Sequence, residues 1–452
     1  MLNPADLSRR SFVLGSASAL LAAGAAPTPA RSATSTPAVA ESTRSGAAPT
    51  PARSATPPAS PTKERKKVAL LGTVDFKFSH TQHFLDRLLM GYKWDGGWHK
   101  PDVDLVSVYI DQFPEGELSR GRSKQFNVPI YPTVAEALTC GTSKLAVDGV
   151  LIIGEHGEYP KNEMGQVLYP RYKFFQQTVE VFKNSGRSVP VFNDKHLSTD
   201  WKECVQMVET AKSMGFPFLA GSSLPVTWRL PALDLPHNSA LKESVCVGYG
   251  RPDSYDFHGL ETAQCMSERR RGGEVGISSV HSLKGEAMWD HAAKQETTAR
   301  LMVAALNRSQ SLPIVDGYES APITLDWARK NFSDAYAYFI EHRDGFKTTL
   351  FMVPTQDFNY AGIDEAGKIT SCQMYLPMPG RASSTADFFN PLIHHVEQMV
   401  LTHKVPYPVE RTLLTSGMTM AGVESLFRGA KVETPQMEVK YKVGPDSTFW
   451  RS

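Results

Sequence analysis

VPVFNDKHLSTDWKECVQMVETAKSMGFPFLAGSSLPVTWR, residues 189–229, is the stretch that decides the fold. It begins with a short apolar run and a polar turn that contains Lys195. Residues 201–211 then repeat apolar side chains at helical spacing, and a second apolar run at 216–220 ends on a Gly-Ser-Ser turn. Because open parallel sheets bind ligands at the carboxyl ends of their strands, this strand–helix–strand unit makes Lys195 a candidate for chemistry.

The sequence before this stretch alternates short apolar runs with segments of helical periodicity. Strands that alternate with helices predict a doubly wound parallel sheet of the mononucleotide-binding type. We therefore expect a Rossmann-like dinucleotide-binding domain at 66–230. Its predicted strands are 68–71, 105–110, 149–153, 189–192 and 216–220.

After Pro231 the pattern changes, because apolar strand-like runs follow one another with few helices between them. Strands in succession predict a largely antiparallel open sheet. We expect an α+β domain for substrate binding and oligomerisation at 231–452. Its predicted strands are 275–283, 335–342, 348–353 and 370–375, with helices at 257–271 and 391–403.

The N-terminus carries a twin arginine, Arg9 and Arg10, followed by an Ala- and Gly-rich apolar run. The run is too short for a stable membrane span, and residues 1–30 resemble a twin-arginine export signal. Residues 31–65 are rich in Pro, Ala, Ser and Thr and predict a disordered linker. The sequence thus predicts a protein handled by the twin-arginine export machinery and located in the periplasm or outside the cell.

The composition narrows the classes of partner. The 452 residues carry a net charge of +1, which gives no reason to expect nucleic acid as a ligand. The five cysteines have no spacing typical of a zinc site or a redox pair. A small molecule is the expected partner.

Two groups of residues follow the first and second predicted strands. Gly72 and Thr73 stand where a nucleotide-binding glycine turn belongs, but GTVDFK has only the first glycine of GxGxxG. Asp75 in this turn would oppose the approach of a pyrophosphate. Asp111 either accepts a hydrogen bond from a ribose hydroxyl or caps a loop.

Glu155 and His156 follow the third predicted strand, at the same edge of the sheet. A carboxylate beside an imidazole can orient a cofactor or substrate or bind a metal, or the two residues belong to a solvated loop. Nothing nearby in the sequence completes a metal-binding signature, and no metal site is predicted.

Lys195 and His258 are the candidates for catalysis. Lys195 can donate a hydrogen bond to a hydroxyl or carry a proton at a depressed pKa, and as a loop residue it would contribute little to stability; the alternative is a plain surface lysine. His258 and Glu261 are three residues apart and share a helical face, which suits a general acid/base held by a carboxylate. Asp256 lies beside them, and the alternative role for His258 is capping or packing.

In order, these segments resemble the glucose–fructose oxidoreductase / inositol dehydrogenase (Gfo/Idh/MocA) family from Lys66 to the end. The resemblance rests on VALLGT, VYIDQF, VPIYPTVAEAL, DGVLIIGEHGEYP, NDKHLS and the closing PYPVERTLL…VETP. Lys195 matches the family's catalytic-site lysine, and His258 with Glu261 resembles its proton-relay histidine and the acid three residues later. The resemblance also implies a homo-oligomer. The cofactor-binding positions that it implies are Gly72, Thr73, Asp111, Glu155, His156 and Asp194.

The resemblance implies an enzyme that transfers a hydride between NAD or NADP and a hydroxyl-bearing carbon of a sugar, cyclitol or related polyol. This chain departs from its pattern: two glycines are absent, Glu-Lys-Pro is Asp194-Lys195-His196, and Thr-Pro is Glu155-His156. We therefore carry three hypotheses. The first is an exported oxidoreductase with a tightly held nicotinamide cofactor. The second is a carbohydrate-binding or non-redox lyase- or hydrolase-like protein without a dinucleotide, and the third is a metal-assisted enzyme that uses His156 and His258.

Overall fold

The computed structural model describes residues 64–312, 322–377 and 385–451. The predicted signal peptide and residues 31–63 of the predicted linker lie outside this part of the chain. No helix within it combines the length and the apolar character that crossing a bilayer requires.

The first sheet has six parallel strands in the order β5-β4-β1-β6-β7-β8. This is the doubly wound order, and it reverses direction between β1 and β6. The predicted Rossmann-like architecture is confirmed. The strands are β1 (Lys66–Gly72), β4 (Val103–Ile110), β5 (Ile130–Tyr131), β6 (Gly149–Ile153), β7 (Val191–Asp194) and β8 (Phe218–Gly221).

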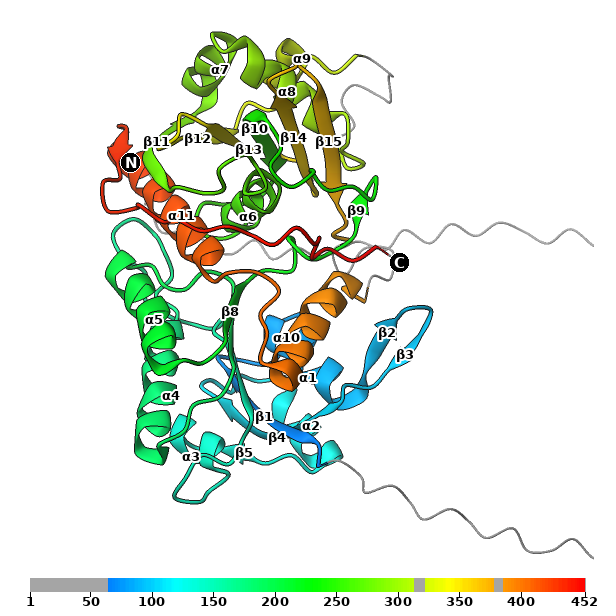
Figure 1. Cartoon of the computed structure of the whole chain (residues 1–452), viewed down its shortest axis with the longest axis vertical. Coiled ribbons are helices and arrows are strands. Elements are labelled where there is room, and N and C mark those ends of the chain that lie inside the picture. The colour runs from blue at the N-terminus through cyan, green and yellow to red at the C-terminus, as the bar shows by residue number, and fades with distance from the viewer. Residues whose placement is uncertain (1–63, 313–321, 378–384, 452) are drawn as a thin grey trace, which may run out of the picture. The chain divides into compact units, whose positions relative to one another are not determined.

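Helices cover both faces of this sheet (Figure 1). The helices from the same half of the chain are α1 (His80–Met90), α2 (Ser119–Phe126), α3 (Val134–Thr139), α4 (Arg171–Ser185) and α5 (Trp201–Met214). A short hairpin, β2 (Tyr92–Trp94) and β3 (Gly97–His99), follows α1.

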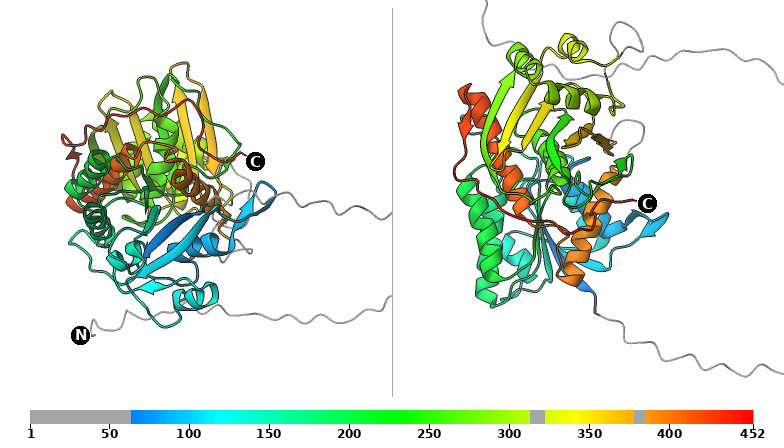
Figure 2. Two further views of the ribbon diagram at one scale, coloured as in Figure 1. Left: turned by 60° about the horizontal axis from the view of Figure 1, so that its bottom comes forward. Right: turned by 45° about the horizontal axis from the view of Figure 1, so that its top comes forward.

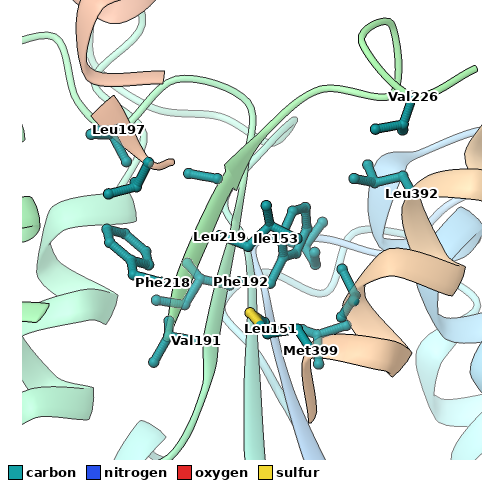
Figure 3. Close-up of a cluster of buried hydrophobic side chains, with 14 of the residues drawn as sticks. Leu151, Ile153, Val191, Phe192, Leu197, Phe218, Leu219, Val226, Leu392 and Met399 are labelled. Carbon is teal, nitrogen blue, oxygen red and sulfur yellow. The ribbon is translucent and has the colours of Figure 1, made fainter. Parts of the chain in front are cut away.

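A helix from the C-terminal half of the chain, α10 (Asn390–Thr402), also packs on the first sheet. Figure 3 shows Leu392 and Met399 of α10 beside Leu151 and Ile153 of β6. A Cβ atom at Gly149 would lie only 2.6 Å from the side chain of Val400, so helix and strand are in close contact. The second half of the chain therefore helps to build the first domain.

The second sheet has eight strands in the order β16-β11-β12-β13-β10-β14-β15-β9, and only the β10–β13 pair is parallel. The predicted, largely antiparallel sheet is confirmed. Its strands are β9 (Arg229–Leu230), β10 (Leu241–Gly248), β11 (Ile277–Lys284), β12 (Tyr336–His342), β13 (Lys347–Met352), β14 (Phe358–Asp364), β15 (Ile369–Met374) and β16 (Val432–Glu433). The sequence did not predict β10 or β14.

Helices lie on both faces of the second sheet (Figures 1 and 2). α6 (Asp256–Ser267) and α11 (Glu410–Arg428) occupy the face turned toward the first domain. α7 (Gly285–Ala293), α8 (Glu296–Leu306) and α9 (Leu325–Asn331) enclose an apolar core on the other. The homo-oligomer that the resemblance implies stays a prediction.

Candidate functional site

A cavity of about 230 Å³ lies at the carboxyl ends of β6, β7 and β8, where the first domain meets the start of α6 and the short 3₁₀ helix η1 (Asp387–Phe389). Five residues singled out from the sequence line it: Glu155, His156, Asp194, Lys195 and His258. Ligand pockets for drug-sized molecules measure about 300–1,000 Å³, so this volume suits a single sugar-sized ring.

Three charged side chains meet at one side of this cavity. Lys195 directly follows β7, with a φ of 60°, and its Nζ donates to Oε1 of Glu155 at 3.0 Å. The other carboxylate oxygen of Glu155 accepts a hydrogen bond from Arg171 at 2.6 Å. All three residues are buried, with at most 7% of their surface exposed. Arg171, at the start of α4, was not identified from the sequence.

This network fixes the charge of its members. Burial alone would lower the pKa of Lys195, but the carboxylate of Glu155 more than offsets this effect and the pKa is raised. Burial likewise opposes ionisation of Glu155, but Lys195 and Arg171 hold its pKa well below the usual range. Lys195 is therefore an ammonium, and the predicted depressed pKa is wrong because the lysine is paired and not merely desolvated.

A second pair stands beside the first. His80 lies in the first turn of α1, after the N-cap Ser79, and lines the cavity. Its Nδ1 lies 2.6 Å from Oδ2 of Asp194, which is 1% exposed. An imidazole whose Nδ1–H donates to a carboxylate presents Nε2 as a proton acceptor. Asp194, predicted to bind a cofactor, thus orients His80, a residue the sequence did not single out.

Two further imidazoles at the cavity have a free nitrogen. Nε2 of His156 and Nδ1 of His258 are buried and have no hydrogen-bond partner among the described residues. Burial lowers the pKa of His156 to about 4 and that of His258 well below its usual range. Both rings are neutral at pH 7. Each can accept a hydrogen bond from a hydroxyl group or donate one to it.

The predicted pairing of His258 with Glu261 is not present. Oε2 of Glu261 accepts a hydrogen bond from the backbone N–H of Ser222 at 2.6 Å, and burial raises the pKa of Glu261 to about 7. Glu261 therefore ties α6 to the turn after β8.

Asp256 also has a structural role. Its carboxylate accepts hydrogen bonds from three backbone N–H groups, those of Asp253, Ser254 and Phe257, and from the hydroxyl of Tyr338. It fixes the first turn of α6, and with it the position of His258, but it does not line the cavity.

The predicted ribose-side residue, Asp111, is occupied by protein groups. The hydroxyls of Tyr109 and Tyr159 donate to its two carboxylate oxygens at 2.6 and 2.7 Å. The neighbouring Gln112 exchanges two hydrogen bonds with the backbone of Glu158, both at 2.9 Å. The segment after β6 is thereby fastened to the end of β4, where the ribose of a dinucleotide would lie.

The turn after β1 is equally closed. Asp75 is fully buried, and neither of its carboxylate oxygens has a hydrogen-bond partner in the described structure. Thr73 donates its hydroxyl proton to the backbone carbonyl of Glu155, and Gly72 packs against Thr81 and Ile110. A buried carboxyl group does not suit a pyrophosphate site. The side chains of Thr73 and Asp111 are thus engaged by protein groups, and Gly72 is packed closely.

Comparison with known proteins establishes the fold. No protein-family model and no curated protein matches the sequence. GenD2 from gentamicin A biosynthesis, solved with NAD, matches over 84% of this chain and 99% of its own, with a TM-score of 0.51 and 14% identity. The chain has the two-domain fold of the Gfo/Idh/MocA family.

A second solved structure agrees with the first. The myo-inositol dehydrogenase from Lactobacillus casei, in complex with NAD(H) and myo-inositol, matches over 82% of this chain and 97% of its own, with a TM-score of 0.50 and 10% identity. The family resemblance read from the sequence is thus confirmed as one of fold.

Because Lys195 and Glu155 form a buried ion pair, we expect their contributions to the free energy of unfolding to be strongly coupled. Lys195→Met would leave Glu155 with one cation, and we expect a loss of about 3 kcal/mol in the free energy of unfolding, measured in urea. This revises the expectation that Lys195 contributes little to stability. In a double-mutant cycle with Glu155→Gln, the double variant should lose less than the sum of the single losses by about 1–3 kcal/mol.

The exposed pair Lys431 and Glu341 provides the control. Its cycle should give a coupling below about 1 kcal/mol, because solvent screens both charges. Equal coupling in the two cycles would show that the Lys195–Glu155 contact is not a buried ion pair.

Asp75 predicts a dependence of stability on pH. Burial raises its pKa to about 7, so the folded state holds the proton more tightly than the unfolded chain, whose carboxyl titrates near 3.8. The contribution of Asp75 to stability is therefore present in acid and is lost as the pH rises from about 4 to 7.

At pH 4 the free energy of unfolding of Asp75→Asn should equal that of the natural protein. At pH 8 it should be higher by on the order of 3 kcal/mol, measured by urea unfolding. Asp95→Asn, at an exposed turn position, should leave the pH profile unchanged. A variant Asp75→Asn with the natural pH profile would contradict the burial of an ionisable carboxyl at this turn.

Proposed function

We propose that this chain is an enzyme that binds one sugar, cyclitol or related polyol in the cavity and, where that molecule carries a carbonyl group, moves the proton of the neighbouring hydroxyl-bearing carbon. The observation that carries the proposal is the meeting of a carboxylate-held imidazole, His80, and a buried ammonium, Lys195, at one small cavity. These are a proton acceptor and a fixed positive charge, which removal of a proton from the carbon next to a sugar carbonyl requires.

The residues have distinct roles in this proposal. His80 takes the substrate proton at Nε2, while Asp194 holds the ring through Nδ1 and stabilises the imidazolium that forms. Lys195 donates a hydrogen bond to the substrate oxygen on which negative charge develops. Because Lys195 is already held by Glu155, this donor need not reorganise during the reaction. The C–H electron pair forms the C=C bond of an enediolate, and the imidazolium returns its proton to the same or the neighbouring carbon, so that the sugar is epimerised or isomerised without a redox partner.

A polyol suits the remaining lining of the cavity. Its hydroxyl groups both donate and accept hydrogen bonds, as the neutral imidazoles of His156 and His258 require. The Lactobacillus casei neighbour, which has this fold, was solved with myo-inositol. The substrate class in the proposal rests on this match between the cavity and the neighbour's ligand.

Oxidation of such a polyol with NAD or NADP is the second candidate. It is favoured by the NAD complexes of both structural neighbours. The occupied carboxylate of Asp111 and the buried Asp75 speak against it. In either case the proposal includes export by the twin-arginine route to the periplasm or beyond, supported by Arg9, Arg10 and the apolar run after them.

His80→Gln tests the proposed base. The natural protein is first screened with myo-inositol, other cyclitols and monosaccharides in D₂O, with deuterium incorporation and product formation followed by NMR and mass spectrometry. For a polyol that reacts, His80→Gln should reduce turnover by about 10²–10⁴-fold, because a positioned general base contributes that much, while calorimetry shows the polyol still bound. His291→Gln, in α7 outside the cavity, is the control. Unchanged turnover in His80→Gln would exclude the proposed base.

The dinucleotide content separates the two candidates. Protein exported with its own signal sequence should, after denaturation, release no stoichiometric NAD(H) or NADP(H), and added dinucleotide should not raise its melting temperature. Release of one dinucleotide per chain would instead favour the second candidate.

A further inference from the structure

The β2–β3 hairpin lies beside α10 (Figure 1). Three side chains of types that can bind metals converge there, outside the cavity. His99 ends β3, while His394 and Glu397 are three residues apart on α10 and so share a helical face. One ligand atom of each residue lies within 4.8 Å of the other two. The three ligand atoms are thus close enough together to hold one metal ion.

The carboxylate of this cluster is fixed in place. Glu397 is 1% exposed and accepts hydrogen bonds from the backbone N–H of Asp102 and the hydroxyl of Tyr92. Nε2 of His99 lies 2.8 Å from Oε2 of Glu397. Hydrogen bonds from outside the cluster orient metal-binding carboxylates in the same way.

His394 is the member of the cluster with an unpartnered ring nitrogen. Its Nδ1 is buried and has no hydrogen-bond partner among the described residues. The ring stacks on Trp94 at a centroid distance of 4.2 Å, and Trp94 in turn packs against Trp450 at 3.5 Å. His99 and Glu397 lie close to this ring, and packing alone does not require polar groups there. The free nitrogen beside them points to a ligand.

We propose that His99, His394 and Glu397 form a binding site for a divalent transition metal, with Zn²⁺ as the best match. Two imidazoles and one carboxylate are a borderline donor set, which suits zinc better than the all-oxygen sites of magnesium or calcium. On binding, the ring proton of His99 moves from Nε2 to Nδ1, which frees Nε2 for the metal. Water completes the coordination.

The ion would join segments that are distant in the sequence. β3 belongs to the first domain, and α10 returns to it from the C-terminal half of the chain. A ligand that binds only the folded state stabilises it. The site therefore has a structural role, independent of the polyol cavity and of its chemistry.

The test uses the full-length exported protein without a histidine tag, freed of metal by a chelator. Titration with ZnCl₂ should show one tight site per chain and a rise in melting temperature that EDTA reverses. His99→Gln and His394→Gln should each weaken binding by at least about tenfold, since even outer-sphere partners are worth about 10–100-fold. His395→Gln, next in the helix and bonded to the carbonyl of Thr448, should bind as the natural protein does.

The Co²⁺ absorption spectrum supplies a readout that does not depend on stability. The natural protein should develop the visible bands of cobalt in a nitrogen and oxygen site, and both ligand variants should lose them. The absence of a saturable site in the natural protein, or equal affinity in the ligand variants and the control, would overturn the proposal.

Discussion

The carboxylate of Glu155, shared between Lys195 and Arg171, is the interaction on which the site depends. The three residues come from the end of β6, the end of β7 and the start of α4, so the pairing joins three neighbouring elements at one edge of the sheet. Each charge would be costly to bury alone, and together they offset much of that cost. The pairing also keeps Lys195 protonated, which makes it a fixed hydrogen-bond donor at the cavity.

The groups at the carboxyl edge of the first sheet also bear on where a dinucleotide could bind. In a doubly wound sheet the crevice beside the reversal of strand order is where a dinucleotide lies. Here the segment after β6 is fastened across that crevice through Tyr159 and Glu158, and the turn after β1 buries Asp75. The cavity that Lys195 and His80 line lies beside these contacts. A shared fold with NAD-dependent enzymes therefore does not by itself settle the chemistry.

The sequence predicted the parts of the structure that strong local patterns encode. The five apolar runs of the first domain became strands of one parallel sheet, and Lys195 lies at the expected edge. β14 was missed because Asn359 and Gly362 interrupt its apolar pattern. His80 was missed because α1 begins eight residues after Gly72, so no spacing rule connects this histidine to the strand end.

The error at His258 has a different cause. Spacing of three residues identifies a shared helical face, but α6 is buried along its whole length and every face meets protein. Glu261 therefore found a partner in Ser222, while His258 faces the cavity. A fully enclosed helix gives no amphipathic signal from which the partner of a polar side chain can be read.

The most direct test of the account is a crystal structure of the protein with a polyol that it binds. We predict one polyol molecule in the cavity, with a hydroxyl oxygen about 2.6–3.2 Å from both Nε2 of His80 and Nζ of Lys195, and with Tyr159 still bonded to Asp111. A structure in which a dinucleotide displaces Tyr159, or in which the polyol contacts neither His80 nor Lys195, would contradict it.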